Sequence, residues 1–287
     1  MKKYFIYLSI IISISASSQD KSAYNIFDKS GTSSSYSEML STVSGSDIVF
    51  FGELHNNAVS HWLQLELTKD LFILKQNRII LGAEMFESDQ QLLLDEYIEG
   101  LITKKNFEEQ ARLWPNHNTD YAPLLDFAAD NKIPFIATNI PRRYASIVFK
   151  EGFESLNSLS DDAKNYIAPL PIAYDPEIPS YKSMIQMGGM SGHTSANLPK
   201  AQAAKDATMA HFIITNYTFD KLFLHFNGSY HSDNYEGIVW YLKRVDSDIK
   251  ITTITTIEQE DINALNADNL GIADFIIVVD EDFTKTY

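Results

Sequence analysis

Six short apolar runs, separated by stretches with helical spacing, constrain the fold of this chain more than any other feature. Residues 48–52 are almost wholly apolar, which is typical of a strand buried on both faces of a sheet. Similar runs recur at 78–84, 133–139, 221–228, 249–257 and 274–279. Between them, apolar residues repeat at helical spacing, and we expect helices over 61–75, 88–99, 104–113, 120–131, 199–217 and 235–243. Strands that alternate with helices predict an α/β fold, with a mainly parallel sheet and helices on both faces.

The first eighteen residues have the three parts of a secretory signal peptide. Lys2 and Lys3 form a positive start, an apolar run follows over 4–12, and small residues lead up to Ser18. We therefore expect cleavage between Ser18 and Gln19, and export to the periplasm or out of the cell. The apolar run is shorter than the roughly 20 residues that a membrane-spanning helix needs. No later segment is more suitable, so we do not expect the chain to span a membrane.

The pattern predicts one domain after a linker. Residues 19–47 are rich in serine and are expected to form an N-terminal linker, followed by a single α/β domain over 48–287. Within that domain, residues 168–199 contain five prolines, two adjacent glycines and three methionines. A segment of this kind is usually a lid or binding insert, and we expect it to pack beside the site. The alternative is a surface excursion with one short helix.

Composition excludes several classes of function. The chain has no cysteine, so it has no disulfide, no thiolate metal site and no c-type haem attachment. The formal net charge is −15, which argues against nucleic acid and anionic membranes as partners, because both require clustered lysine and arginine. No nucleophile elbow, phosphate-binding loop or zinc-protease helix is present.

Polar side chains stand at the ends of four successive predicted strands. Glu53 and His55 follow the first run, and Glu84 ends the second. Asn139 ends the third run, and the fourth leads through Gly228 to His231. Ligands of open parallel sheets bind at the carboxyl ends of the strands, so these residues are expected to converge there.

Two kinds of chemistry fit the predicted set Glu53, His55, Glu84 and His231. Two carboxylates and two imidazoles can hold a divalent metal ion, or they can work without metal as an acid–base pair. Each residue also has a structural alternative, because acids can cap helices and histidines can be buried and hydrogen-bonded. Asp206 lies on an otherwise apolar helical stripe and is expected to support the site or to make a buried hydrogen bond.

The chain resembles the ChaN-like haem-binding uptake family, which is grouped with the erythromycin esterases and the Tiki proteases. The resemblance covers about 48–242 and is carried by five motifs: FGELHNN at 51–57, GAEMF at 82–86, ATNIPRRYASIV at 137–148, AQAAKDATMA at 201–210 and FNGSYHSDNYEG at 226–237. It implies an α/β fold, export, a role in haem or iron acquisition, and dimers that pair around haem. In the related hydrolases the Glu and His positions, here Glu53, His55, Glu84 and His231, serve hydrolysis, in some cases with a metal.

The leading interpretation is an exported haem-binding protein of iron uptake, with haem or another small molecule as partner and a homodimer as the assembly. Tyrosine can ligate haem iron, and Tyr144 is the first choice because Arg142 and Arg143 beside it can meet haem propionates. Three further tyrosines are candidates: Tyr174, Tyr181 and Tyr230. The alternative function is a hydrolase that uses a metal ion or a Glu/His acid–base pair.

Overall fold

The computed structural model describes residues 21–191 and 196–287, with 186–191 described by backbone alone. The predicted signal peptide, residues 1–18, lies outside the described residues. In the described part, no helix is long and apolar enough to cross a membrane.

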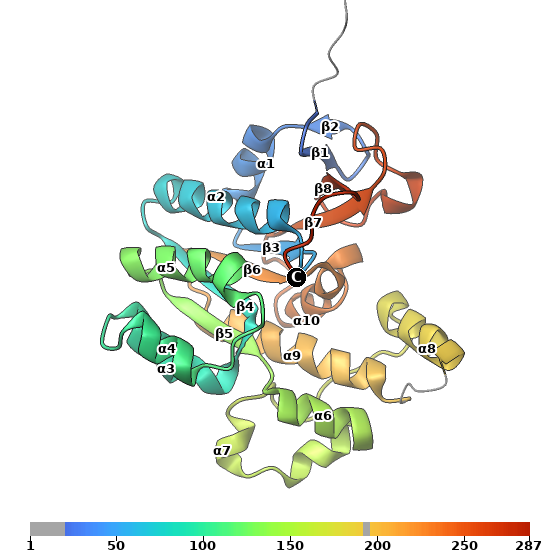
Figure 1. Ribbon diagram of the computed structural model, residues 1–287. Coiled ribbons are helices and arrows are strands. Elements are labelled where there is room, and N and C mark those ends of the chain that lie inside the picture. The colour runs from blue at the N-terminus through green and yellow to red at the C-terminus, as the bar shows by residue number, and fades with distance from the viewer. Residues whose placement is uncertain (1–20, 192–195) are drawn as a thin grey trace, which may run out of the picture.

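A single sheet of eight strands organises the domain (Figure 1). Its order is β2-β1-β8-β7-β3-β6-β4-β5, and every pair from β8 to β5 is parallel. The parallel strands are β3 (Ile48–Glu53), β4 (Ile79–Glu87), β5 (Phe135–Asn139), β6 (Leu222–Gly228), β7 (Ile251–Gln259) and β8 (Phe275–Asp280). These are the six predicted strands, and the predicted α/β class with a mainly parallel sheet is confirmed.

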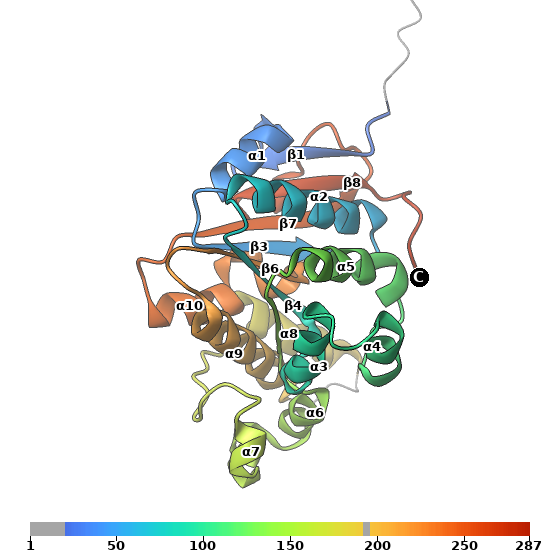
Figure 2. The same ribbon diagram turned by 90° about the vertical axis from the view of Figure 1, so that its left-hand side faces the viewer.

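Helices cover both faces of this sheet (Figures 1 and 2). One face carries α1 (Tyr36–Val43), α2 (Ala58–Leu74), α3 (Gln91–Ile98), α4 (Lys104–Gln110) and α5 (Ala122–Asn131). The other carries α6 (Arg142–Glu151), α9 (Leu198–Asn216) and α10 (Ile238–Val245), and α7 is a short helix at Asp161–Lys164. Strand β3 serves both cores, because Val49 and Phe51 point to the first face while Ile48 and Phe50 point to the second.

The linker expected over 19–47 is instead largely part of the fold. Strand β1 (Tyr24–Asp28) pairs antiparallel with β8 and with the short β2 (Ser33–Ser34), and helix α1 follows. Ile26, Phe27 and Met39 are buried. A strand of five residues with mixed burial has no long apolar run, which is why composition suggested a linker.

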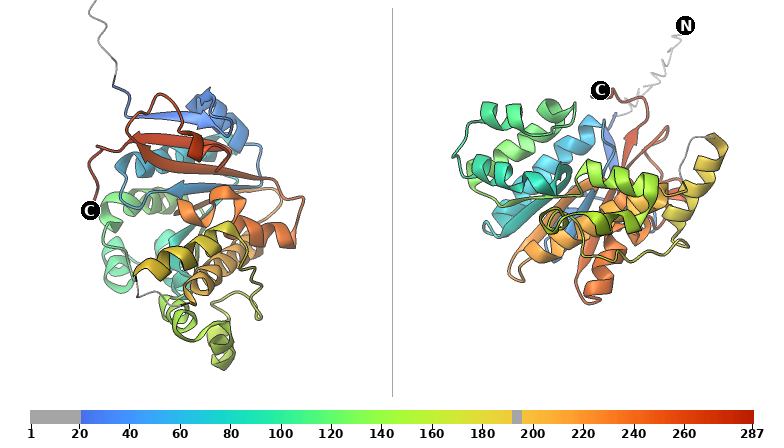
Figure 3. Two further views of the ribbon diagram at one scale, coloured as in Figure 1. Left: turned by 90° about the vertical axis from the view of Figure 1, so that its right-hand side faces the viewer. Right: turned by 90° about the horizontal axis from the view of Figure 1, so that it is seen from below.

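The proline-rich insert packs on the second face. Helix α8 (Pro179–Ser191) lies beside α9 (Figure 3), and Tyr181 from α8 is buried with Ile178 and Ala203. The backbone amide of Ser180 donates to Glu236, which follows the end of β6. The described part of the insert therefore lies near the carboxyl edge of the sheet.

The buried N-terminal segment leads to a first prediction. Met39→Ala should lower the free energy of unfolding by about 2–5 kcal/mol, because it leaves a cavity beneath α1. Ser41→Ala in the same helix is the control, since Ser41 is exposed and its change should be close to neutral. Urea unfolding of both variants measures the difference. Equal stability of the two variants would show that this segment is not part of the cooperative fold.

Candidate functional site

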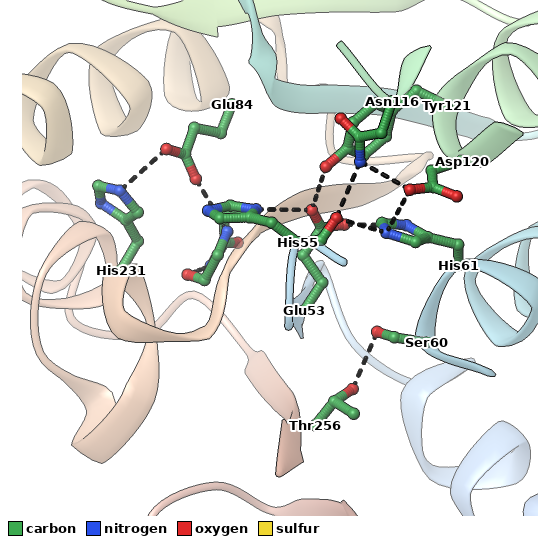
Figure 4. A network of polar contacts seen from close by, with 12 residues as sticks. Glu53, His55, Ser60, His61, Glu84, Asn116, Asp120, Tyr121, His231 and Thr256 are labelled. Carbon is green, nitrogen blue, oxygen red and sulfur yellow. Dashed lines mark hydrogen bonds and ion pairs between the residues drawn. The ribbon is translucent and has the colours of Figure 1, made fainter. Parts of the chain in front are cut away.

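The four strand-end residues lie together at the carboxyl edge of the sheet (Figure 4). Glu53 ends β3, His55 follows it, Glu84 lies near the end of β4, and His231 lies in the turn Ser229–His231 directly after β6. All four line one cavity. They come together because β3, β6 and β4 are adjacent and parallel, so their ends meet at one edge.

Glu53 and His55 form the first pair. Glu53 is 1% exposed, and its carboxylate accepts hydrogen bonds from His55 Nδ1 at 2.9 Å, Tyr121 Oη at 2.7 Å and Gln64 Nε2 at 2.5 Å. Burial, and then the charge of Glu53, raise the pKa of Tyr121 far above its usual range, so the phenol stays protonated and donates. Burial acts to lower the pKa of His55, but the hydrogen bond to Glu53 and the charge of Glu84 raise it above its ordinary value.

A second layer of polar residues holds the backbone beneath His55. His61 Nε2 lies 3.1 Å from the His55 carbonyl, and Asn116 Nδ2 donates to the same oxygen at 2.8 Å. Asn116 and Thr286 both donate to Asp120, at 2.7 Å each. The C-terminal segment also fastens the turn that carries His55, because the Thr286 amide donates to the Asn56 carbonyl at 3.0 Å.

Glu84 and His231 form the second pair, which is buried. Glu84 Oε2 accepts from the Gly228 amide at 2.8 Å, and Glu84 Oε1 lies 3.2 Å from His231 Nε2. His231 Nδ1 donates to Asp206, which also accepts from the Tyr181 hydroxyl at 2.7 Å. The chain Tyr181–Asp206–His231–Glu84 thus connects α8 to the floor of the site, and Asp206 has the supporting position expected from the sequence.

Glu84 and His231 each determine the protonation state of the other. Burial acts to lower the pKa of His231, but the carboxylates of Glu84 and Asp206 raise it to about 10. Burial likewise acts to raise the pKa of Glu84, but the charge of His231 holds it far below its usual range. The pair is therefore an imidazolium and a carboxylate at neutral pH.

Gly228 brings the two pairs into contact. A Cβ atom at this position would lie 2.8 Å from both Cε1 and Nε2 of His55, and 3.5 Å from Glu84 Oε2. Real side chains do not tolerate the first distance, so only glycine lets the His55 ring lie over the end of β6 while the Gly228 amide binds Glu84.

The site opens into a cleft. Two cavities of about 710 and 450 Å³ share four lining residues, His55, Glu84, Gln202 and Lys205. The His55 side chain is 38% exposed there, and the Trp114 ring packs against it edge to face at 4.9 Å between centroids. The walls of the larger cavity are one face of α6, one face of α9 and residues 112–114.

Of the three residues predicted to bind haem, Arg142, Arg143 and Tyr144, one lines the cleft. Arg142 lines the cleft, but Tyr144 is 9% exposed and lies in the core of the second face. Arg143 stacks 4.4 Å above the Tyr144 ring and donates to Asp89 at 2.6 Å. Residues two apart on a helix lie on nearly opposite sides, so Arg142 and Tyr144 cannot face the same cleft. Of the four tyrosines considered, Tyr230 lines the cleft.

The structure separates the four predicted metal ligands into two hydrogen-bonded pairs. Among the described residues, no group of three or more histidines, aspartates and glutamates has a geometry that could hold a metal ion. Sequence reasoning missed Gln64, Asn116 and Tyr121, which position Glu53 and His55.

The buried His231 pair predicts a pH-dependent stability. Folding favours the protonated imidazole, so its stabilisation is complete below the ordinary pKa near 6.5 and is lost as pH rises through about 10. His231→Gln should therefore cost about 3–5 kcal/mol at pH 7, since it leaves buried charges unpaired, and clearly less at pH 10. Urea unfolding at both pH values measures this, with His211→Gln as control. An equal cost at the two pH values would contradict the assignment.

The first pair predicts a change in the titration of His55. Glu53→Gln should lower the pKa of His55, because burial then acts without the charged hydrogen-bond acceptor. An NMR pH titration of the imidazole resonances measures it, and Glu66→Gln on the outer side of α2 is the control. An unchanged pKa would mean that Glu53 does not govern His55.

Comparison with known proteins agrees with this architecture. Residues 39–242 match the family model described as "Haem-binding uptake, Tiki superfamily, ChaN". A solved structure of cofacial haem binding to ChaN of Campylobacter jejuni has a TM-score of 0.67 and 17% identity, covering 89% of this chain and 96% of that one. A succinoglycan biosynthesis protein has a TM-score of 0.51 and 11% identity, with 85% and 90% covered.

One curated protein also aligns, over a shorter stretch. Protein RETICULATA-RELATED 5, chloroplastic, of Arabidopsis thaliana is 24% identical over 163 residues, which are 53% of this chain and 22% of that protein. The chain thus spans less than a quarter of that relative's length. The structural likenesses show the fold, while the family model covers most of the sequence and includes every strand-end residue described above. The chain belongs to the haem-binding uptake family ChaN of the Tiki superfamily.

Proposed function

We propose that this protein is an exported haem-binding protein of the uptake type, and that haem binds in the cleft above Glu53, His55 and Glu84. Membership of the family and the likeness to a ChaN that binds haem cofacially support the proposal. The observation that carries it is His55. Its imidazole is exposed to the cleft, Nδ1 is held by a buried carboxylate, and Nε2 has no hydrogen-bond partner among the described residues.

The side chains of the cleft fit the iron of haem. Histidine, methionine and tyrosine all ligate haem iron, and His55, Met184 and Tyr230 line the cleft. A histidine that binds metal usually donates its other ring nitrogen to a carboxylate, which fixes the ring and its tautomer. Glu53 does this for His55, and Tyr121 and Gln64 hold Glu53 in turn. When bound, haem would supply an iron centre with open coordination positions and a large apolar ring.

The cleft also fits the macrocycle. Its volume of about 710 Å³ lies within the usual range for sites that bury a cofactor. Apolar side chains form much of its wall: Leu113, Trp114, Ile140, Ala145, Phe149, Leu198 and Ala201. The family resemblance extends the proposal to two chains that pair around haem at this open face.

A second candidate function, hydrolysis, is favoured by the same pair of residues. A buried carboxylate that orients an exposed imidazole is the arrangement of a general base, which could activate a water molecule against an ester or amide. In this reading Glu53 and His55 act without metal, and the Glu84–His231 pair shapes the floor. The Glu53→Gln variant separates the two functions, because hydrolysis should be abolished, while haem binding should weaken through loss of the carboxylate that orients His55 but stay saturable.

Titration of the purified protein with ferric haem tests the leading proposal. We expect saturable binding with a shifted Soret band, and His55→Gln should change the band and weaken binding about tenfold or more. Tyr144→Phe is the matched control and should leave both unchanged, because Tyr144 lies in the core. If the Soret band and the haem affinity change in Tyr230→Phe and not in His55→Gln, the iron ligand is the Tyr230 phenol. Absence of saturable binding would overturn the proposal.

A further inference from the structure

We infer that Arg142, Lys150 and Lys205 form a carboxylate-binding wall in the cleft, and that this wall receives the propionates of the bound porphyrin. The inference rests on the proposed haem function and goes beyond it, since it states which feature of the ligand is recognised and by which residues. It also implies a ligand class, a flat apolar molecule with two carboxylates.

The larger cavity is lined by more basic than acidic residues, although the protein as a whole is acidic. The chain has 38 acidic and 23 basic residues, yet the larger cavity is lined by four cations, Arg112, Arg142, Lys150 and Lys205, and by two acids, Glu84 and Glu87. Basic residues therefore outnumber acidic residues in this cavity, against the balance of the whole chain. Like charges that line a cleft focus their field and raise the local concentration of anions.

Both acids in the cleft are already neutralised. Glu84 is paired with His231 and accepts the Gly228 amide, and Glu87 accepts from Arg112 Nε at 3.0 Å. Arg112 is in addition paired with Asp89. Both acidic residues of the larger cavity, Glu84 and Glu87, thus already have partners.

The other three cations have no ion pair within 21–191 and 196–287. Arg142 and Lys150 are exposed, and Lys205 is half-buried on α9. Some cations elsewhere on the described surface are paired with carboxylates, as Lys104, Lys182 and Lys285 are. Three cations left unpaired around one cavity are therefore available to an anionic ligand.

The helices place these cations at the ends of apolar stripes. On α6 the lining residues are Arg142, Ala145, Ser146, Phe149 and Lys150, spaced three, four, seven and eight from the first, which is one helix face. On α9 they are Leu198, Ala201, Gln202 and Lys205, with the same spacing. Arg142 and Lys150 are separated by about 12 Å of helix rise, with apolar side chains between them. Such a wall suits a ligand whose apolar body carries more than one separate anionic group.

In a porphyrin, the anionic groups that match this arrangement of cations are the two propionate carboxylates. Arginine can bind a carboxylate through two parallel hydrogen bonds, while lysine supplies a mobile point charge. Lys205 lines both cavities together with His55 and Glu84, whereas Arg142 and Lys150 line the larger cavity alone, from α6. The propionates and the iron of one ligand can therefore be recognised by different parts of the same cleft.

The experiment compares ferric protoporphyrin IX with its dimethyl ester, in which both carboxylates are uncharged. Fluorescence quenching or absorbance titrations give the dissociation constants for the full protein, for Lys205→Gln and for the Arg142→Gln/Lys205→Gln double variant. Lys200→Gln is the matched control, because Lys200 lies on the same helix but does not line the cleft. All titrations use the same buffer, ionic strength and content of organic solvent.

We expect the wild-type protein to bind haem at least tenfold more tightly than the diester. Lys205→Gln should weaken haem binding about five- to tenfold and leave diester binding unchanged, and the double variant should bring the ratio close to one. Lys200→Gln should keep the wild-type ratio. If the wild-type protein binds haem saturably but binds the diester equally tightly, the carboxylate wall is overturned and the haem proposal stands. The same holds if the double variant keeps the wild-type ratio of the haem and diester affinities. Absence of saturable binding for both porphyrins overturns the haem proposal and this inference with it.

Discussion

The arrangement of this site depends on two carboxylates that are buried at the edge of a parallel sheet. Glu53 and Glu84 are 1% and 4% exposed, and an unpaired charge at such a depth would be very costly. Each therefore needs several donors, and these come from different parts of the chain. Glu53 draws on α2, on the turn before α5 and on His55, while Glu84 draws on the end of β6 and on His231. Satisfying the two charges fixes the positions of these elements around one point.

The two carboxylates have different surroundings and hence different roles. Glu84 is closed into a chain that runs through His231 and Asp206 to Tyr181, so its charge is fully used within the protein. Glu53 instead holds His55 so that its ring is exposed to the cleft. The walls of that cleft carry apolar side chains with cationic residues at either end. The first pair thus presents a chemically useful imidazole, and the second pair supports the floor on which it lies. The proposed haem binding would use both floor and walls, whereas hydrolysis would use the floor alone.

The sequence was sufficient for the parallel core and for much of the site. Runs such as 48–52 are apolar because both faces of the strand are covered, and polar residues directly after them must lie at the sheet edge. Strand β1 was missed because its burial is partial and its pairing with β8 is antiparallel and distant in sequence. Tyr144 was chosen for its neighbours along the chain, but helix geometry turns it inward while Arg142 faces the cleft. The hydrogen bonds of Tyr121 and Gln64 to Glu53 depend on how α2 and the turn before α5 pack against β3, and no local sequence pattern reveals that packing.

In the proposed function, haem occupies the cleft above the two buried carboxylates. The most direct measurement is a crystal structure of the haem-loaded protein, with anomalous data at the iron edge to locate the metal. We expect one iron peak beside His55 Nε2, the porphyrin ring between α6 and α9, and its propionates toward Arg142, Lys150 and Lys205. An iron peak elsewhere on the molecule, with the cleft empty or filled by solvent, would contradict it.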